Sequence, residues 1–229
     1  MPAPERRPES SESTVFAKGS RKGEETRRRI LDVALQAFGE EGFAAVSTRR
    51  IAEAAAVNLP ALRYYFGGKQ GLYLACAHEI VGEYQARLQT LQADLAEALQ
   101  DDMSPDVARA SLKAVLRALV DIQIGSQRSE IWLAFVQREI SEQGPAFGLL
   151  FDSLWAPGVN LAADLISRIS GAAGRSEAAR LRAVLLVSSF AAFGVARPIT
   201  LKYLDWVSLD AVGLKRIKQA LDEEVDRIR

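Results

Sequence analysis

The sequence predicts an all-α protein, and three observations lead to this fold class. Apolar residues recur at intervals of three and four positions along most of the chain, which is the period of amphipathic helices. Glycine and proline stand between these segments, where helices end and turns begin. No segment shows the strict alternation of apolar and polar residues that indicates a half-buried strand.

The composition is that of a water-soluble globular chain. Of the 229 residues, 48% are hydrophobic and 25% are charged, which is enough apolar material for a sizeable core. There is no apolar run of about 18 residues and no apolar secretory signal, so we expect a cytoplasmic protein that does not associate with a membrane. The single cysteine, Cys76, excludes an internal disulfide and a multi-cysteine metal site.

Charge is distributed unevenly along the chain. The formal net charge is zero, but residues 1–69 contain 12 Lys and Arg against 9 Asp and Glu, and six basic residues lie within residues 18–29. A basic region suits a nucleic-acid partner, although a charged run is more often just a solvated helix face. The asymmetry alone therefore assigns no function.

The N-terminal third predicts a tail followed by a helix. Residues 1–22 are rich in Ser, Pro and Glu and predict a disordered tail. From Glu24 a helical pattern begins, with Ile30, Ala34 and Phe38 at i, i+4 and i+8.

Two shorter helices follow, each with a capping residue. Ser47 is an N-cap signal for the first of them. Asn58 caps the second, Pro60 is tolerated in its first turn, and Gly67 and Gly68 stop it. The tight turn between the two short helices, Ala55 to Asn58, makes this a helix-turn-helix arrangement.

The second short helix has two unlike faces. A helical wheel directs Leu62 and Phe66 inward. The outward and boundary positions are Leu59, Pro60, Ala61, Arg63, Tyr64 and Tyr65. A proline, an arginine and a tyrosine turned outward on so short a helix favour a surface that reads the major groove of DNA.

The chemistry of these side chains fits that interpretation. Arg63 can bond bidentately to a guanine edge, and tyrosine hydroxyls can donate to phosphates. Lys69 lies at the start of the next helix, where its ammonium and free backbone N–H groups can meet a phosphate together. Thr48 and Arg49, at the start of the first short helix, can contact phosphates of the DNA backbone in the same way. The open alternative is that Tyr64 and Tyr65 pack against the following helix and that Arg63 and Lys69 are merely solvated.

The remainder of the chain predicts further helices. A long one covers about 69–99, and Ser104 and Pro105 begin the next, which ends near Ile124. The others cover roughly 129–142, 145–170, 176–197 and 208–228.

Residues 27–75 contain, in order, I-L-x-x-A-x-x-x-F-x-x-x-G-F, T-x-x-x-I-A-x-x-A-x-V and L-x-x-x-F-x-x-K-x-x-L. With these motifs the segment resembles the TetR/AcrR family of bacterial transcriptional regulators. The resemblance implies an N-terminal three-helix DNA-binding domain at 23–69 and a C-terminal helical domain at 70–229 that binds a ligand and dimerises. The segments 138–167 and 201–206 are similar to one subfamily with a characteristic C-terminal domain, whose members imply repressors.

Carried over by position, the contacts to a double-stranded DNA operator that the resemblance implies fall on Thr48, Arg49, Leu59, Pro60, Ala61, Arg63, Tyr64, Tyr65 and Lys69. The chain departs from the family pattern at four of its positions. These are Leu59 for a polar residue, Pro60 for Gly, Arg63 for Tyr and Gly68 for Ser or Thr. The departures concern which operator is read rather than the mode of docking.

The resemblance also implies a small-molecule effector and a homodimer. Candidate ligand-binding residues are Trp132, Phe135, Arg138, Phe147, Phe151 and Trp155, with Arg138 or Glu139 as the polar anchor, although each aromatic residue could equally be plain core. Candidate dimer-interface residues are Ala183, Leu186, Val187, Phe190, Val212, Ile217 and Leu221, on helices that would form a four-helix interface.

Two other function classes were weighed. A helical enzyme would need a nucleophile with a base, a metal cluster or a phosphate loop, and one His and one Cys supply none that we recognise. We therefore expect no catalytic residue, metal site or cofactor. A helical protein-interaction adaptor without DNA binding remains the alternative, and the basic 18–29 segment argues against it.

Overall fold

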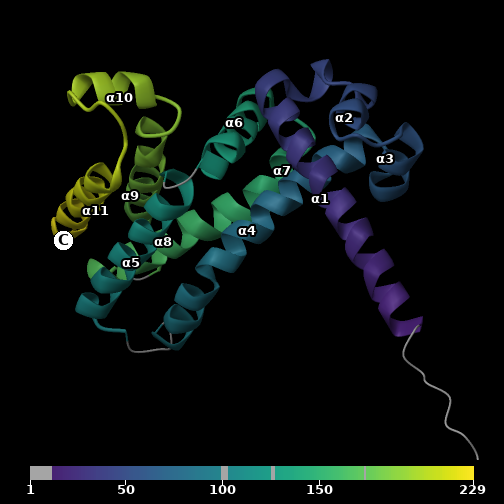
Figure 1. Ribbon diagram of the computed structural model, residues 1–229. Coiled ribbons are helices and arrows are strands. Elements are labelled where there is room, and N and C mark those ends of the chain that lie inside the picture. The colour runs from purple at the N-terminus through teal and green to yellow at the C-terminus, as the bar shows by residue number, and fades with distance from the viewer. Residues whose placement is uncertain (1–11, 99–102, 125–126, 173) are drawn as a thin grey trace, which may run out of the picture.

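The computed structural model describes residues 12–98, 103–124, 127–172 and 174–229. Every regular element among them is a helix, which confirms the all-α class (Figure 1). The α-helices are α1 (Glu12–Ala45), α2 (Thr48–Ala54), α3 (Leu59–Phe66), α4 (Lys69–Ala98), α5 (Pro105–Ile124), α6 (Gln127–Glu142), α7 (Phe147–Leu150), α8 (Ala156–Ile169), α9 (Glu177–Ser188), α10 (Arg197–Tyr203) and α11 (Ala211–Asp226). A π-helical turn, η1 (Phe151–Trp155), joins α7 to α8, and a 3₁₀ turn, η2 (Ser189–Ala192), follows α9.

Helix α1 differs from the expectation at its start. It begins at Glu12, within the 1–22 segment that was expected to be a disordered tail, and residues 1–11 lie outside the described part. No proline interrupts residues 12–22, so nothing in that segment blocks backward extension of the helix. At the other end Gly42 adopts φ 84° and ψ 169°, a left-handed conformation that favours glycine and breaks the helical path.

The two short helices are capped as the sequence indicates. The Ser47 side chain accepts from the Arg50 N–H at 3.2 Å, and the Asn58 side chain accepts from the Ala61 N–H at 2.8 Å. Gly67 ends α3 in the left-handed conformation, with φ 73°. In the turn between α2 and α3, Ala56 also has a positive φ of 51°, which is costly for a residue with a Cβ.

Two hydrophobic cores hold the helices together. The first joins α1, α2 and α3 to the beginning of α4 and to α6 and α7, with Phe38, Tyr73 and Phe135 among its largest members. The second joins α5, α8, α9 and α11. The first core therefore continues past residue 69, the expected domain boundary, so the three-helix head is packed onto α4 and α6 rather than tethered to them.

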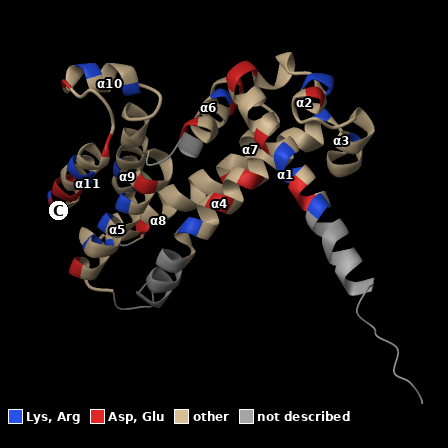
Figure 2. Cartoon of the chain, in the orientation of Figure 1, with Lys and Arg blue, Asp and Glu red and all other residues tan. Residues whose placement is uncertain are grey.

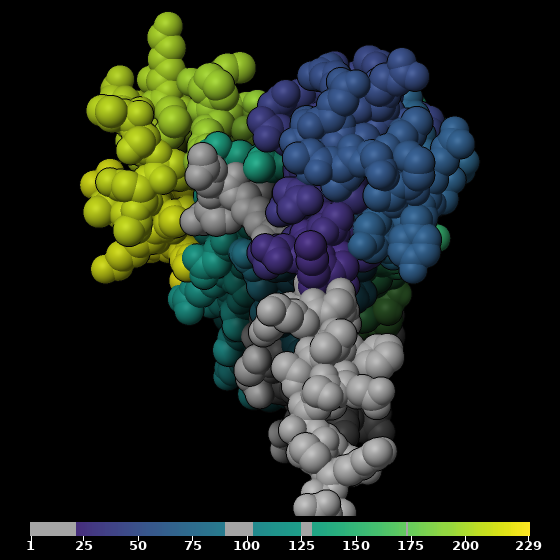
Figure 3. All heavy atoms as spheres, turned by 45° about the vertical axis from the view of Figure 1, so that its right-hand side comes forward, coloured from purple at the N-terminus to yellow at the C-terminus, as the bar shows by residue number. Residues whose placement is uncertain are grey.

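The C-terminal half contains one helix that the sequence analysis did not foresee. Pro198 directly follows the expected helix at 176–197, and it occupies the first turn of α10, where the missing N–H has no intrahelical partner to lose. The expected helix at 145–170 is the continuous run α7–η1–α8. Figure 3 shows the α1–α3 region (purple and blue) on one side of the molecule and α9–α11 (yellow-green) on the other.

By length and composition alone, Phe147–Ile169 could cross a membrane, as could the bent pair Glu177–Ala192 and Arg197–Tyr203 taken together. The α8 part of the first stretch contributes Ala163, Leu165 and Ile166 to the second core. Core helices pass the same test, so the finding gives weak support for a membrane span.

Candidate nucleic-acid interface

Helix α3 separates an inner face from an outer face. Leu62 is 0% exposed and Phe66 is 8% exposed, and both belong to the first core. Tyr64, in contrast, is 85% exposed, and Pro60 and Arg63 are exposed beside it. The structure thus brings an arginine, a proline and a tyrosine together on one uncovered helix face.

Tyr65 occupies the boundary between these faces. It is half-buried and packs against the first core, to which α1, α2 and α4 all contribute. Its ring meets that of Tyr64 edge-on, with centroids 5.3 Å apart. Tyr65 therefore supports the position of Tyr64 and exposes only part of its own surface.

Helix α3 is joined closely to α4. A Cβ at Gly71 would overlap the Phe66 carbonyl oxygen, so only glycine permits this approach. The Leu72 N–H donates to the Gly68 carbonyl at 3.0 Å, and Arg27 lies over the Phe66 ring at 5.7 Å. Helix α3 is therefore held rigidly against the beginning of the long helix by its inner face and C-terminal end, and its outer face stays uncovered.

Lys69 has a structural contact that the sequence analysis missed. Its Nζ donates to the Ala44 carbonyl at 3.1 Å and lies 4.8 Å from the centroid of the Phe43 ring. The side chain thus ties α4 to the last turn of α1, beyond the break at Gly42. An ammonium has three donors, so two N–H groups are available beyond the bond to Ala44.

Helix α2 lies beside α3 and carries further basic residues. Arg49 is exposed and Thr48 is half-buried at the start of the helix, whereas Arg50 forms an ion pair with Glu41 at 2.5 Å. Arg29 of α1 donates to the Ala55 carbonyl at 2.8 Å and so fixes the turn between α2 and α3. The basic positions of α1, α2 and α3 lie at the same end of the molecule (Figure 2).

The candidate ligand residues line neither of the two concave regions described below, and their part in ligand binding stays a prediction. Trp132 and Phe135 are buried in the first core, and Phe135 packs 4.7 Å from the Tyr73 ring centroid. The rings of Phe147 and Phe151 are stacked, with centroids 6.3 Å apart, but Phe151 and Trp155 are exposed on η1. Periodicity placed these aromatic residues on helices, but it did not distinguish core from pocket.

Arg138 and Glu139 also have roles other than ligand anchor. Arg138 donates to the carbonyls of Gly39 at 3.2 Å and Glu40 at 2.7 Å, so it caps the C-terminal end of the regular part of α1. Glu139 is 1% exposed and accepts from the Tyr73 hydroxyl and from the Ala146 N–H. Burial, and then the bond to Glu139, raise the pKa of Tyr73 above its usual value.

Trp132, Phe135 and Glu139 are spaced by three and four positions, so they share one face of α6. This spacing is the sequence feature that indicates that the Glu139 carboxylate faces inward. Sequence reasoning treated Glu139 as a polar exception to be satisfied by a ligand, whereas the protein's own chain satisfies it. The pair links α4 to α6 and to the turn before α7.

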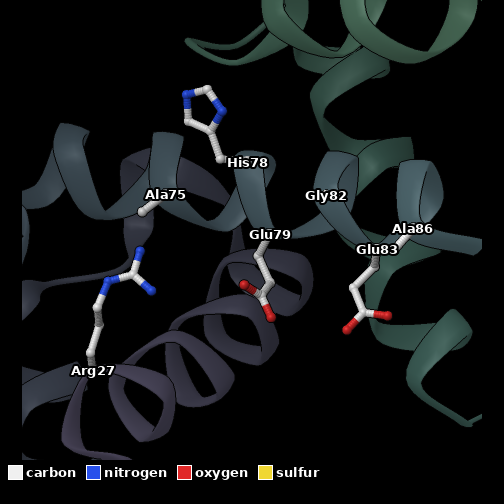
Figure 4. Close-up of a pocket in the computed structure, with 7 residues that line it drawn as sticks. All are labelled: Arg27, Ala75, His78, Glu79, Gly82, Glu83 and Ala86. Carbon is white, nitrogen blue, oxygen red and sulfur yellow. The ribbon is translucent and has the colours of Figure 1, made fainter. Parts of the chain in front are cut away.

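Two concave regions lie elsewhere. One, of about 370 Å³, lies between α1 and α4, where Arg27, Glu79 and Glu83 point toward it and His78 projects away from them (Figure 4). Its lining combines charged side chains with the small residues Ala75, Gly82 and Ala86 and contains no large apolar side chain, unlike a usual small-molecule site. The other, of about 330 Å³, lies where α5, α6 and the segment from η2 to α10 meet.

Most residues expected at the dimer interface lie inside the subunit, and the interface itself stays a prediction. Ala183, Phe190, Ile217 and Leu221 are buried in the subunit's own second core, with Leu186 and Val187 half-buried against it. Only Val212 is exposed, at 57%. The uncovered apolar residues of this region are instead Leu181, Val184, Leu185, Val195, Ile199, Tyr203, Leu204, Val207 and Val212.

Sequence comparisons match both halves of the chain. Residues 30–76 match the model of bacterial regulatory proteins, tetR family, and residues 108–228 match the C-terminal domain of the HTH-type transcriptional dual regulator CecR. The CecR protein of Shigella flexneri is 30% identical over 209 residues, covering 90% of this chain and 92% of that protein. RutR of Escherichia coli K12 is 35% identical over 79 residues, or 34% of this chain and 37% of RutR.

Solved structures share the fold at low sequence identity. FadR from Bacillus subtilis, solved in complex with stearoyl-CoA, has a TM-score of 0.57 and 14% identity over 88% of this chain and 98% of its own. NalD is the secondary repressor of the MexAB-OprM multidrug efflux pump in Pseudomonas aeruginosa. It has a TM-score of 0.56 and 20% identity, and the match covers 90% of this chain and 96% of NalD.

Proposed function

The chain belongs to the tetR family of bacterial regulatory proteins and is a helix-turn-helix transcriptional regulator, and from this premise we propose that it is a cytoplasmic, homodimeric repressor released from a palindromic operator by a small molecule. The observation that carries the DNA-binding part is the division of α3. Its buried face fixes the helix, and its uncovered face presents Arg63 and Tyr64 to a partner.

Within this proposal, each residue has a stated contact. Arg63 reads a base edge in the major groove, where a guanidinium bonds bidentately to guanine. Pro60 and Ala61 provide small apolar surface for thymine methyl groups, and Tyr64 donates to a phosphate. Leu59 and Tyr65 pack at the edges of the same contact, because both are only partly buried.

The remaining proposed contacts go to the DNA backbone. Thr48 and Arg49 lie at the beginning of α2, where the first backbone N–H groups have no intrahelical acceptor and Ser47 accepts from that of Arg50. Lys69 uses one N–H on the Ala44 carbonyl and offers the others to a phosphate. This arrangement makes Lys69 both a structural tie and a charge for the operator.

A dimer follows from the size of the reading surface. One helix of eight residues covers few base pairs, and two symmetric half-sites about one helical turn apart are the usual solution. We place the dimer contact on the exposed apolar stripe Leu181, Val184 and Leu185 of α9, on the side opposite the second core. Val212 of α11 is the exposed member of the expected dimer set and is a second candidate for this contact.

The proposal includes no enzymatic activity, because the matched relatives are transcriptional regulators. It is favoured over an adaptor without DNA binding, since an adaptor would not need an arginine, a proline and a tyrosine uncovered beside a second basic helix.

The operator is obtained by selecting genomic fragments on the purified protein, and the assignment is tested by gel shift over a salt series. Arg63→Gln is expected to weaken the free energy of binding to the selected operator by about 1–3 kcal/mol. It is also expected to reduce the preference for one base at the position that Arg63 contacts. Lys69→Gln is expected to weaken all sequences alike and to lower the salt slope by about one.

Lys215→Gln removes the same charge from an exposed position on α11, at the far end of the molecule, and is expected to leave binding unchanged. If the Arg63 variant binds every sequence as the wild type does, α3 is not the reading helix.

A further inference from the structure

The cavity of about 330 Å³ beside α6 has the make-up of a small-molecule site. Its apolar wall includes Leu133 of α6, Phe193 after η2, and Pro198 of α10. Its polar groups include Glu130 of α6 and Arg197 of α10, which form an ion pair with each other. An apolar wall with a few polar groups, at the small end of the usual volume range, is typical of a site for a small ligand.

We propose that this cavity is the effector site of the regulator, and that its ligand is a small organic carboxylate with an apolar body. The inference rests on the proposed function and adds to it a location, a ligand class and a route to the DNA-binding helices.

The ligand class follows from an asymmetry in the ion pair. The Arg197 side chain is 28% exposed, whereas the Glu130 side chain is 58% exposed. A carboxylate that enters the cavity can replace Glu130 on the guanidinium, because Glu130 is already mostly in water and turns into it at little cost. A cationic ligand would have to displace the more enclosed Arg197 instead. Planar guanidinium groups bind carboxylates bidentately, which adds geometric selectivity.

Glycine fixes the distance between the two walls. A Cβ at Gly194 would overlap the Leu133 side chain, so the absence of a side chain lets the segment before α10 approach α6. The position of α6 and the width of the cavity are therefore tied to each other. A ligand that fills the cavity favours one position of α6 over another.

The same turns of α6 hold the end of α1. Gly39 of α1 faces this helix so closely that a Cβ there would lie 3.3 Å from the Phe135 backbone nitrogen and 3.4 Å from the Ala134 Cβ. Ala134 also lines the cavity. One turn further on, Arg138 donates to the Gly39 and Glu40 carbonyls. A displacement of α6 is thus passed to α1 and through it to α2 and α3. The ligand acts by binding one arrangement more tightly than the other.

Calorimetric titration without DNA tests the site and the ligand class. The probes are 2-naphthoate and its neutral counterpart 2-naphthamide. The acid is expected to bind at micromolar to millimolar concentration and the amide at least about tenfold more weakly. Arg197→Gln is expected to weaken binding of the acid by roughly tenfold or more, whereas Glu130→Gln is expected to strengthen it, because the competing carboxylate is gone.

The two variants remove the same ion pair. If that ion pair only stabilised the fold, both substitutions would change the affinity for the acid in the same direction. Equal losses would overturn the proposal, and so would the absence of any binding of the acid at millimolar concentration. Equal affinity for the acid and the amide would overturn the carboxylate assignment.

Gel shift on the selected operator tests the route. The acid is expected to lower operator affinity about tenfold, and Arg138→Gln is expected to keep acid binding while reducing that effect. Binding of the acid with no change in operator affinity would overturn the effector role. If the ligand-free wild type binds no DNA at all, the proposed function is refuted instead. The calorimetric titration would still show whether the cavity binds the acid, because it contains no DNA.

Discussion

The buried pair Tyr73–Glu139 gives the sharpest stability prediction. Tyr73→Phe removes one hydroxyl and keeps the ring in its contacts with Phe38, Phe43 and Phe135. Glu139 is then left with one donor, the Ala146 N–H, in a place where water does not reach it.

A hydrogen bond to a charged group contributes about 1.5–3 kcal/mol, and a buried group left short of a partner adds to the loss. We therefore expect the free energy of unfolding to fall by about 2–3 kcal/mol. Urea unfolding followed by circular dichroism measures it, at one fixed protein concentration because a dimer's stability depends on concentration.

Tyr84→Phe is the matched control. Tyr84 lies on the same helix, is half-buried, and packs 6.2 Å from the Trp132 ring, but its hydroxyl donates to no other group in the described part of the chain. Its loss is expected to cost less than about 0.5 kcal/mol. If the two substitutions have equal effects, the hydrogen bond to Glu139 does not stabilise the fold, and the link between α4 and α6 must be explained by apolar packing alone.

Three further predictions concern the turn, the thiol and the dimer. Ala56→Gly is expected to raise the free energy of unfolding by up to about 1 kcal/mol, because glycine adopts the positive φ at this position without strain; a lower urea midpoint would contradict this. Burial raises the pKa of Cys76, so the folded thiol keeps its proton while the unfolded one loses it above about pH 8.5. The free energy of unfolding is therefore expected to fall at higher pH by up to about 1.4 kcal/mol per pH unit. Urea unfolding at about pH 8 and pH 10 measures this pH dependence, and Cys76→Ala should remove the part that comes from the thiol. An unchanged pH dependence in Cys76→Ala would contradict the prediction. Leu185→Glu is expected to shift the protein to monomer in sedimentation velocity, whereas Val107→Glu, at an exposed apolar position on α5, should leave the dimer intact; dimers in both variants would rule out the α9 surface.

The N-terminal helices were predictable because their signals are local. Asn58 and Gly67 mark the ends of α3 within a few residues of chain, and the 3.6-residue period separates Leu62 and Phe66 from Tyr64 without knowledge of any other element. The contact of Lys69 with the Ala44 carbonyl was not predictable in this way, because it joins residues 25 positions apart. The same holds for Arg138, which reaches α1 across 99 and 98 positions.

The C-terminal half shows where periodicity fails. Helix α9 is apolar around most of its circumference, so the pattern could not tell the face that meets the subunit's own core from the face left uncovered. Ala183 was therefore assigned to a dimer contact although it is buried inside the subunit, and Leu185 was overlooked. Helix α10 was missed because proline is compatible both with the end of a helix and with its first turn.

The two faces of α3 also bear on how this regulator can diverge. Residues that keep the helix in place, Leu62 and Phe66, are separate from those that meet a partner, Arg63 and Tyr64. Substitutions on the outer face remove no buried contact, so they change which operator is preferred while leaving folding nearly untouched. A library randomised at Pro60, Ala61, Arg63 and Tyr64 should therefore yield mostly folded proteins with new binding preferences. Recognition in this protein is free to evolve separately from stability.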